Sequence, residues 1–211
     1  MSYRLVVMDV DSTLIQDEVI ELLADHAGTR ELVTAVTESA MRGEIDFEQS
    51  LRQRVATLKG VPETALEEVR SRVRLSVGAK ELISAVHGAG GRVGAVSGGF
   101  EQILTPLARE LNLDYARANV LEIQDGVLTG GLVGKIIDRA AKAEALIEWA
   151  EDFGEETAWV AAIGDGANDL DMFEVAGLSF AYNAKPMVRE RADVSIDTPD
   201  LALVIPHLKL K

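Results

Sequence analysis

Short apolar runs alternate with segments of helical periodicity over most of this sequence, and this alternation limits the folds that the chain can adopt. Apolar and β-branched residues dominate 4–8, 92–96 and 158–163, which predicts buried strands. Segments with apolar residues three and four apart, near 100–111 and 140–152, predict helices beside these strands. We therefore expect an α/β fold of three layers, with a doubly wound, mostly parallel sheet covered by helices on both faces.

The region after the first strand departs from this alternation. Between residues 17 and 75 the apolar side chains recur at helical spacing, which predicts an all-helical insert. We expect a catalytic core formed by residues 1–16 and 76–211, and a helical cap formed by residues 17–75. Within the core, Asp125-Gly126 lies between alternating apolar residues and predicts a small β-hairpin.

The composition restricts the ligands that such a fold could use. The chain has 211 residues and no cysteine, so oxygen or histidine would hold any metal, and a hard cation is the leading candidate. A net charge of −14 repels phosphate backbones and anionic membranes, so we expect neither nucleic acid nor membrane as a partner. There is no signal-peptide pattern and no apolar run of about 18 residues. A cytoplasmic protein is therefore expected.

Two aspartates, Asp9 and Asp11, follow the first predicted strand directly. Ligands bind at this carboxyl edge of parallel sheets. Asp9 is placed to act as a carboxylate nucleophile on a phosphoryl group. Asp11 could protonate the leaving oxygen and later deprotonate water. A strand followed by an aspartate-capped turn would explain the same pair without any chemistry.

A second segment, Ser97-Gly98-Gly99, also follows a predicted strand and precedes a predicted helix. A hydroxyl and the N–H groups of a glycine turn at a helix N-terminus suit a phosphate, although such turns also occur without a ligand. Lys142 lies in the predicted helix over 140–152. It could be a solvated surface lysine, but a phosphate among several carboxylates needs a cation to offset their repulsion.

A third strand end carries Asp165, Asn168 and Asp169 among small residues. Mg²⁺ bound by oxygen needs one or two protein carboxylates, which Asp165 and Asp9 together could supply. Asn168 or Asp169 could instead cap the helix that follows. Because there are more capping residues here than one helix end requires, we favour the metal site.

Taken together, these segments resemble the ordered motifs of haloacid dehalogenase-type phosphatases. The motifs are Asp9-Val10-Asp11-Ser12-Thr13, Ser97-Gly98-Gly99-Phe100, Lys142 and Gly164-Asp165-Gly166-Ala167-Asn168-Asp169. The resemblance spans essentially the whole chain, and within the superfamily it is closer to the phosphoserine phosphatases of the short form, without an extra N-terminal domain. It implies Mg²⁺-dependent hydrolysis of L-phosphoserine to L-serine and phosphate, the last step of serine biosynthesis, through an aspartyl-phosphate intermediate.

The resemblance also implies roles for individual residues. Asp9 would be the nucleophile and Asp11 the general acid and base, and Mg²⁺ would be held by Asp9, Asp11 through its backbone carbonyl, and Asp165, with Asp169 in support. The phosphate would be bound by Ser97, Gly98, Gly99, Lys142 and Asn168.

The predicted cap would supply the contacts that select the substrate. By the same resemblance, Glu18 would meet the substrate ammonium and Arg54 its carboxylate, a pairing that suits arginine geometry. Met41 and Phe47 would shield the site from water. Without the motifs, Met41 and Phe47 could be core residues, and Glu18 and Arg54 ordinary surface charges.

Three alternatives remain open at this point. The same scaffold could pass the phosphoryl group to an alcohol such as homoserine, or could hydrolyse a different small phosphomonoester. A catalytically silent phosphate-binding module is a further possibility, against which the intact Asp9, Asp11, Lys142 and Asp165 argue. The chain is expected to be a monomer or a homodimer.

Overall fold

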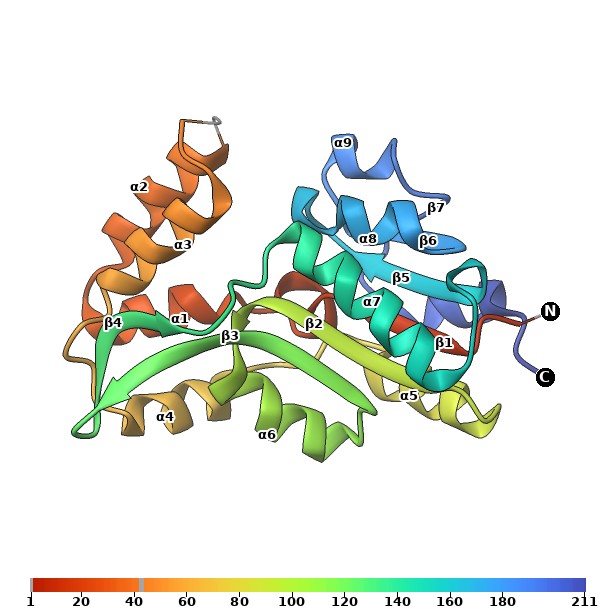
Figure 1. The fold of residues 1–211 in the computed structure, drawn as a ribbon, viewed down its shortest axis with the longest axis horizontal. Coiled ribbons are helices and arrows are strands. Elements are labelled where there is room, and N and C mark those ends of the chain that lie inside the picture. Colours follow the sequence, from red (N-terminus) through yellow and green to blue (C-terminus); the bar gives the residue numbers. More distant parts are fainter. Residues whose placement is uncertain (1, 42–43) are drawn as a thin grey trace.

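One mostly parallel sheet forms the centre of the molecule (Figure 1). We describe residues 2–41 and 44–211 from a computed structural model. Its strands are β1 (Leu5–Met8), β2 (Arg92–Phe100), β3 (Tyr115–Gln124), β4 (Val127–Val133), β5 (Val160–Gly164), β6 (Leu178–Tyr182) and β7 (Val194–Ile196). They lie in the order β4-β3-β2-β1-β5-β6-β7, and β3 and β4 form the antiparallel pair. The predicted α/β class is therefore confirmed.

Helices cover both faces of this sheet (Figure 1). One face packs against α5 (Ala79–Gly88), α6 (Glu101–Leu111) and the 3₁₀ segment η4 (Leu201–Leu208). The other face packs against α7 (Arg139–Phe153) and α8 (Leu170–Val175). Alternate side chains of β1 enter the two cores, Val6 and Met8 the first, Leu5 and Val7 the second. Burial on both faces explains why this strand is a continuous apolar run.

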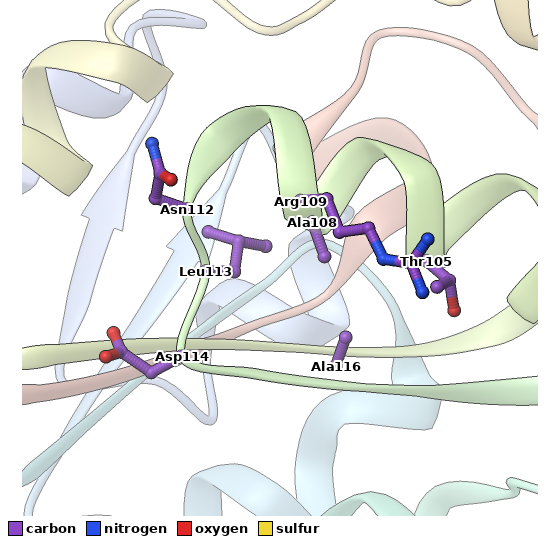
Figure 2. A pocket seen from close by; sticks show the side chains of 7 residues that line it. All are labelled: Thr105, Ala108, Arg109, Asn112, Leu113, Asp114 and Ala116. Carbon is purple, nitrogen blue, oxygen red and sulfur yellow. The ribbon is translucent and has the colours of Figure 1, made fainter.

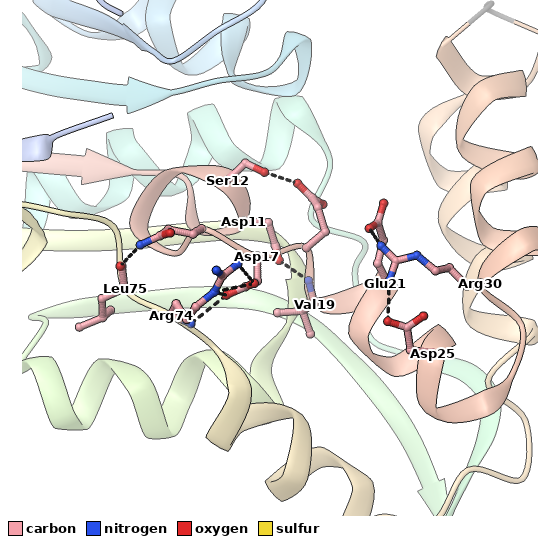
Figure 3. Close-up of polar contacts among 11 residues, drawn as sticks. Asp11, Ser12, Asp17, Val19, Glu21, Asp25, Arg30, Arg74 and Leu75 are labelled. Carbon is pink, nitrogen blue, oxygen red and sulfur yellow. Dashed lines mark hydrogen bonds and ion pairs between the residues drawn. The ribbon is translucent and has the colours of Figure 1, made fainter. Parts of the chain in front are cut away.

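In the part of the insert that the structure describes, four helices follow β1. They are α1 (Val19–Ala27), α2 (Arg30–Met41), α3 (Phe47–Ala56) and α4 (Thr64–Arg72). Helices α2 and α3 project beside β4 in Figure 1, and α3 contacts that strand. The two ends of the insert lie together, because Ile15 pairs with Leu75 and the Arg74 guanidinium binds the Asp17 carboxylate (Figure 3). The assignment of residues 17–75 to a separate cap domain stays a prediction.

Short elements complete the chain. They are the turn η1 (Val10–Leu14), the 3₁₀ turns η2 (Thr157–Trp159) and η3 (Ala167–Asp169), and α9 (Pro186–Arg189). The predicted hairpin turn is present at Asp125 and Gly126, whose φ angles of 51° and 75° fit a two-residue turn between twisted strands. Among the helices of the described residues, none has the length and apolar character needed to cross a membrane.

The segment Ser97-Gly98-Gly99 differs from its predicted form. The prediction of a glycine turn opening a helix is wrong, because β2 continues through both glycines to Phe100 and α6 begins at Glu101. Pairing with β3 is interrupted by a register shift between Val96 and Phe100 and then resumes. The segment is therefore an irregular strand end whose backbone groups lack part of their regular partners.

Candidate active site

The carboxyl ends of three adjacent strands bring the predicted motifs together. Met8 at the end of β1 is in register with Ala95 of β2 and Ile163 of β5. Asp9 follows Met8 directly, and Asp165 follows the end of β5. Parallel pairing thus gathers residues that are far apart in sequence at one edge of the sheet.

Lys142 links two of the aspartates in the interior. Its Nζ donates to Asp9 Oδ1 at 2.6 Å and to Asp169 Oδ1 at 2.7 Å, and all three side chains are buried. Burial alone would lower the pKa of Lys142, but the charges of Asp169 and Asp9 outweigh it and raise that pKa. The lysine is therefore a buried cation, and the surface-lysine interpretation is wrong.

The aspartates around Lys142 carry more negative charge than it can balance. Burial, followed by the charge of Asp169, raises the pKa of Asp9 well above its ordinary value and that of Asp165 to about 6. One ligand oxygen each of Asp9, Asp165 and Asp169 lie within 4.8 Å of one another. Such an all-oxygen, electron-rich donor set fits a hard divalent cation. The Asp11 carboxylate is not part of this group.

Asp11 is held by two other elements. Its Oδ1 accepts a hydrogen bond from the Val19 N–H at 2.8 Å, at the first residue of α1 (Figure 3). Its Oδ2 accepts from Ser97 Oγ at 3.1 Å. Burial raises the pKa of Asp11, although these hydrogen bonds act in the opposite direction. Raising the pKa favours the protonated form of Asp11, which suits this carboxyl to transfer a proton to a leaving group.

Gly98 and Gly99, near the end of β2, allow side chains to approach closely. A Cβ on Gly99 would lie 2.6 Å from Asp11 Oδ2, and a Cβ on Gly98 would lie 3.0 Å from Cζ of Phe47. Phe47, the first residue of α3, therefore contacts the strand end that carries Ser97. The glycines are needed here for close packing rather than for a turn.

The predicted cap residues have different outcomes. Glu18 is exposed to solvent. The protein atoms packed around its carboxyl, followed by the charge of Asp11, nevertheless raise its pKa to about 7. Its Oε1 accepts from Ser12 Oγ at 2.6 Å. Burial lowers the pKa of Arg54, while the charges of Glu18 and Asp11 act in the opposite direction, so these three groups lie within electrostatic reach. The side chain of Met41 lies outside the described residues.

Asn168 and Asp169 follow β5, the strand that leads to Asp165. Asn168 is half-buried, and a Cβ on Gly166 would lie 2.2 Å from its Oδ1. The Asp169 carboxylate makes no cap of α8, because Lys142 engages its Oδ1 and the Gly166 N–H donates to its Oδ2 at 3.1 Å. Asp169 therefore does not cap α8, but its bond from the Gly166 N–H caps the preceding 3₁₀ turn η3.

Sequence reasoning missed two buried residues beside the site. The Thr13 hydroxyl donates to Asp165 Oδ1 at a long 3.5 Å. Asn119, in the middle of β3, binds the backbone of Gly98 and of Ile137. Thr13 stands inside the first motif and could have been singled out there. Asn119 had no such signal, since a single polar residue in a strand is common.

A hollow of about 490 Å³ lies away from this cluster, between the end of α6 and the start of β3 (Figure 2). Its lining residues are Thr105, Ala108, Arg109, Asn112, Leu113, Asp114 and Ala116. None of these is a predicted site residue, so the chemistry is to be sought at the strand ends.

Comparison with known proteins identifies relatives of this chain. Residues 6–174 match the family model described as haloacid dehalogenase-like hydrolase. The chain is 49% identical over 204 residues to a phosphoserine phosphatase of Streptococcus thermophilus, covering 97% of this chain and 95% of that protein. It is 52% identical over 202 residues to one of Mycobacterium tuberculosis, covering 96% of this chain. The chain spans only 49% of the length of that relative.

Solved structures give the same likeness. A phospho-aspartyl intermediate analogue of phosphoserine phosphatase superposes with a TM-score of 0.93 at 40% identity, with 99% of this chain and 100% of the other covered. A substrate-bound phosphoserine phosphatase complex matches with the same TM-score, identity and coverage.

Proposed function

The chain belongs to the haloacid dehalogenase-like hydrolase family, and from this premise we propose that it hydrolyses L-phosphoserine to L-serine and inorganic phosphate. The observation that carries the proposal is the pair Asp9 and Asp11, with the first bound to the buried Lys142 and the second to Ser97 and Val19. The phosphoserine phosphatases to which the chain is similar support the choice of substrate.

In the first step, a carboxylate oxygen of Asp9 forms a bond to phosphorus while the bond from phosphorus to the serine oxygen breaks. Asp11 transfers its proton to that departing oxygen. Lys142 and Ser97 Oγ offset the charge on the phosphoryl oxygens. The products of this step are serine and an acyl phosphate on Asp9.

In the second step, water attacks the phosphorus and Asp11, now a carboxylate, takes its proton. The bond between phosphorus and the Asp9 oxygen breaks, which releases phosphate and restores both carboxyl groups to their starting states. Asp11 serves both halves because the proton that it gives to the serine oxygen is replaced by the proton that it takes from water.

Mg²⁺ is the proposed ion, held by Asp9, Asp165 and the backbone carbonyl of Asp11. Asp169 would support the site rather than bind the ion, since both of its oxygens are engaged by Lys142 and the Gly166 N–H. When bound, the ion would neutralise charge on the phosphoryl oxygens and on the surrounding carboxylates. The close approach of the Asp9 and Asp165 carboxylates and the raised pKa values of these two groups support this assignment.

Residues 17–75 are proposed to act as a cap that covers the substrate. The contact of Phe47 with Gly98 supports this role, as does the electrostatic coupling of Arg54 with Glu18 and Asp11. Exclusion of bulk water would strengthen the electrostatic interactions and protect the acyl phosphate from premature attack. Met41 would contribute to the same cover, and Asn168 would orient the phosphate.

Phosphate release from L-phosphoserine with Mg²⁺ is the direct test of the proposed function. We expect turnover of phosphoserine to exceed that of phosphothreonine and of an aryl phosphate, and a chelator to abolish it until Mg²⁺ is returned. Homoserine in the assay distinguishes hydrolysis from transfer, because transfer would form phosphohomoserine in place of free phosphate. Absence of phosphate release across the panel would instead support a silent binding module.

Substrate selection by Glu18 and Arg54 gives a second expected result. Loss of one charged hydrogen bond costs about 1.5–3 kcal/mol, so Glu18→Gln and Arg54→Ala should each lower kcat/KM for phosphoserine by about 10- to 100-fold. Hydrolysis of an aryl phosphate, which lacks ammonium and carboxylate groups, should change by less than about threefold.

Arg52→Ala is the matched control for this prediction. Arg52 lies on α3, as Arg54 does, but it pairs with Glu48 and is half-exposed. Its loss should leave the hydrolysis of both substrates unchanged. If Glu18→Gln and Arg54→Ala lowered the two activities equally, the assignment of substrate contacts to these residues would be wrong.

A further inference from the structure

Asn119 connects two parts of the site that are separate in sequence. Its side chain is 1% exposed, and both ends of its amide are used. Nδ2 donates to the carbonyl oxygen of Gly98 at 2.9 Å, and Oδ1 accepts from the Ile137 N–H at 2.8 Å. A neutral amide is suited to this place because it offers one donor and one acceptor at a fixed separation.

The bond to Gly98 reaches Asp11 through a short chain of hydrogen bonds. The peptide unit that contains the Gly98 carbonyl also contains the Gly99 N–H, which donates to Ser97 Oγ at 2.7 Å. Ser97 Oγ then donates to Asp11 Oδ2 at 3.1 Å. The Ser97 oxygen accepts the Gly99 N–H with a lone pair, so the single hydrogen of the hydroxyl remains available to donate to Asp11. Fixing the Gly98–Gly99 peptide therefore fixes the position of Ser97 Oγ, whose one hydrogen points at Asp11 in the structure and can turn to a phosphoryl oxygen once substrate is bound.

The bond to Ile137 reaches Lys142. Ile137 immediately precedes Asp138, whose carboxylate caps α7 by accepting from the Ala141 N–H at 2.9 Å. The backbone N–H of Lys142 donates to the Asp138 carbonyl at 3.0 Å. The start of α7, the helix that contains Lys142, is thus connected through the Asn119 side chain to the strand end that carries Ser97.

We propose that Asn119 is a positioning residue for phosphoryl transfer, which sets the Gly98–Gly99 peptide and the start of α7 at a fixed separation. This inference rests on the proposed function. The irregular pairing of β2 with β3 between Val96 and Phe100 leaves the Gly98 carbonyl without a regular strand partner, and Asn119 replaces that partner. Through these two bonds it holds Ser97 toward Asp11 and Lys142 toward Asp9.

Two variants remove one or both of these hydrogen bonds. Asn119→Asp keeps an acceptor for the Ile137 N–H but loses the donor to Gly98, whereas Asn119→Leu loses both at similar volume. Misplacement of reacting groups by about 1 Å costs on the order of 100-fold, so we expect kcat to fall about 10- to 100-fold in both variants. The fall should be equal for phosphoserine and for an aryl phosphate, with KM for each within about threefold of the original.

Gln102→Leu provides a matched control. Gln102 donates to the Leu121 carbonyl at 2.8 Å and accepts from the Leu121 N–H at 3.2 Å, so it also binds the backbone of β3 through both ends of an amide. Among the described residues, Gln102 has no hydrogen bond to a site residue. We expect its loss to lower the thermal midpoint as the Asn119 variants do, but to leave kcat within about twofold.

Amide hydrogen exchange at Gly99 gives a readout independent of turnover. Exchange should be faster in Asn119→Asp than in the original protein and unchanged in Gln102→Leu. Should Asn119→Leu fail to fold, Asn119→Asp alone carries the test. A kcat for Asn119→Asp within twofold of the original, or an equal loss in Gln102→Leu, would overturn the inference. A protein that hydrolyses the aryl phosphate but not phosphoserine would contradict the proposed substrate while leaving the role of Asn119 testable.

Discussion

Asp9→Asn is expected to lower kcat for phosphoserine hydrolysis by at least about 10⁴-fold, as removal of a covalent nucleophile does in other hydrolases. The amide has nearly the same shape as the carboxylate but cannot form the acyl phosphate. Phosphate release under saturating phosphoserine and Mg²⁺ measures the loss. Asp152→Asn, at an exposed surface aspartate that pairs with Arg92, is the control and should retain full activity.

The same substitution should leave the fold intact. Burial and the charge of Asp169 raise the pKa of Asp9 in the folded protein above its value in the unfolded chain. The folded state therefore loses stability as pH rises above the unfolded pKa, because Asp9 ionises more readily in the unfolded chain. Asparagine cannot ionise, and Lys142 keeps Asp169 as a partner. The thermal midpoint at neutral pH should therefore be unchanged or higher. Substantial phosphatase activity in folded Asp9→Asn would show that another group is the nucleophile.

Lys142→Met should have the largest effect on stability. It removes the cation that binds Asp9 and Asp169 at 2.6 and 2.7 Å in the interior. Breaking a buried ion pair by removing one partner costs about 3–5 kcal/mol, since the remaining charge is left without compensation. We expect a loss of this size in urea unfolding, together with loss of phosphatase activity.

A second substitution separates the two consequences of losing Lys142. Lys142→Met/Asp169→Asn removes one of the stranded carboxylates and should recover part of the stability without restoring activity. Lys135→Met is the control, because this exposed lysine pairs with Glu144 at the surface and should contribute little. If Lys142→Met were as stable as the original protein, the buried pair would have no structural role.

The strand ends were predictable because burial on both faces produces an unmistakable pattern. A continuous apolar run that stops at Asp9 indicates a strand buried on both faces that ends there. Parallel pairing with the neighbouring strands then places Ser97 and Asp165 near Asp9. The hairpin turn at Asp125-Gly126 was equally clear, since its conformation favours these residue types.

Other features depend on tertiary contacts that no local pattern contains. Gly98 and Gly99 suggested a turn, because conformational freedom is the usual reason for glycine, yet here they leave room for Phe47 and Asp11. The residues next to Lys142 in the sequence are typical of an exposed helix position. Lys142 became a candidate only because the other motifs predict a phosphate site that needs a cation. Asn119 gave no signal at all, because its two partners are backbone atoms.

The adjacent ends of the helical insert have an evolutionary consequence. Because Ile15 pairs with Leu75 and Asp17 with Arg74, the polypeptide leaves and re-enters the sheet region at nearly the same point. Insertions, deletions or wholesale replacement of the intervening helices can then accumulate without altering the order of the strands. Selectivity for the organic part of a phosphate ester can diverge among descendants of one ancestor while the reacting groups are inherited unchanged.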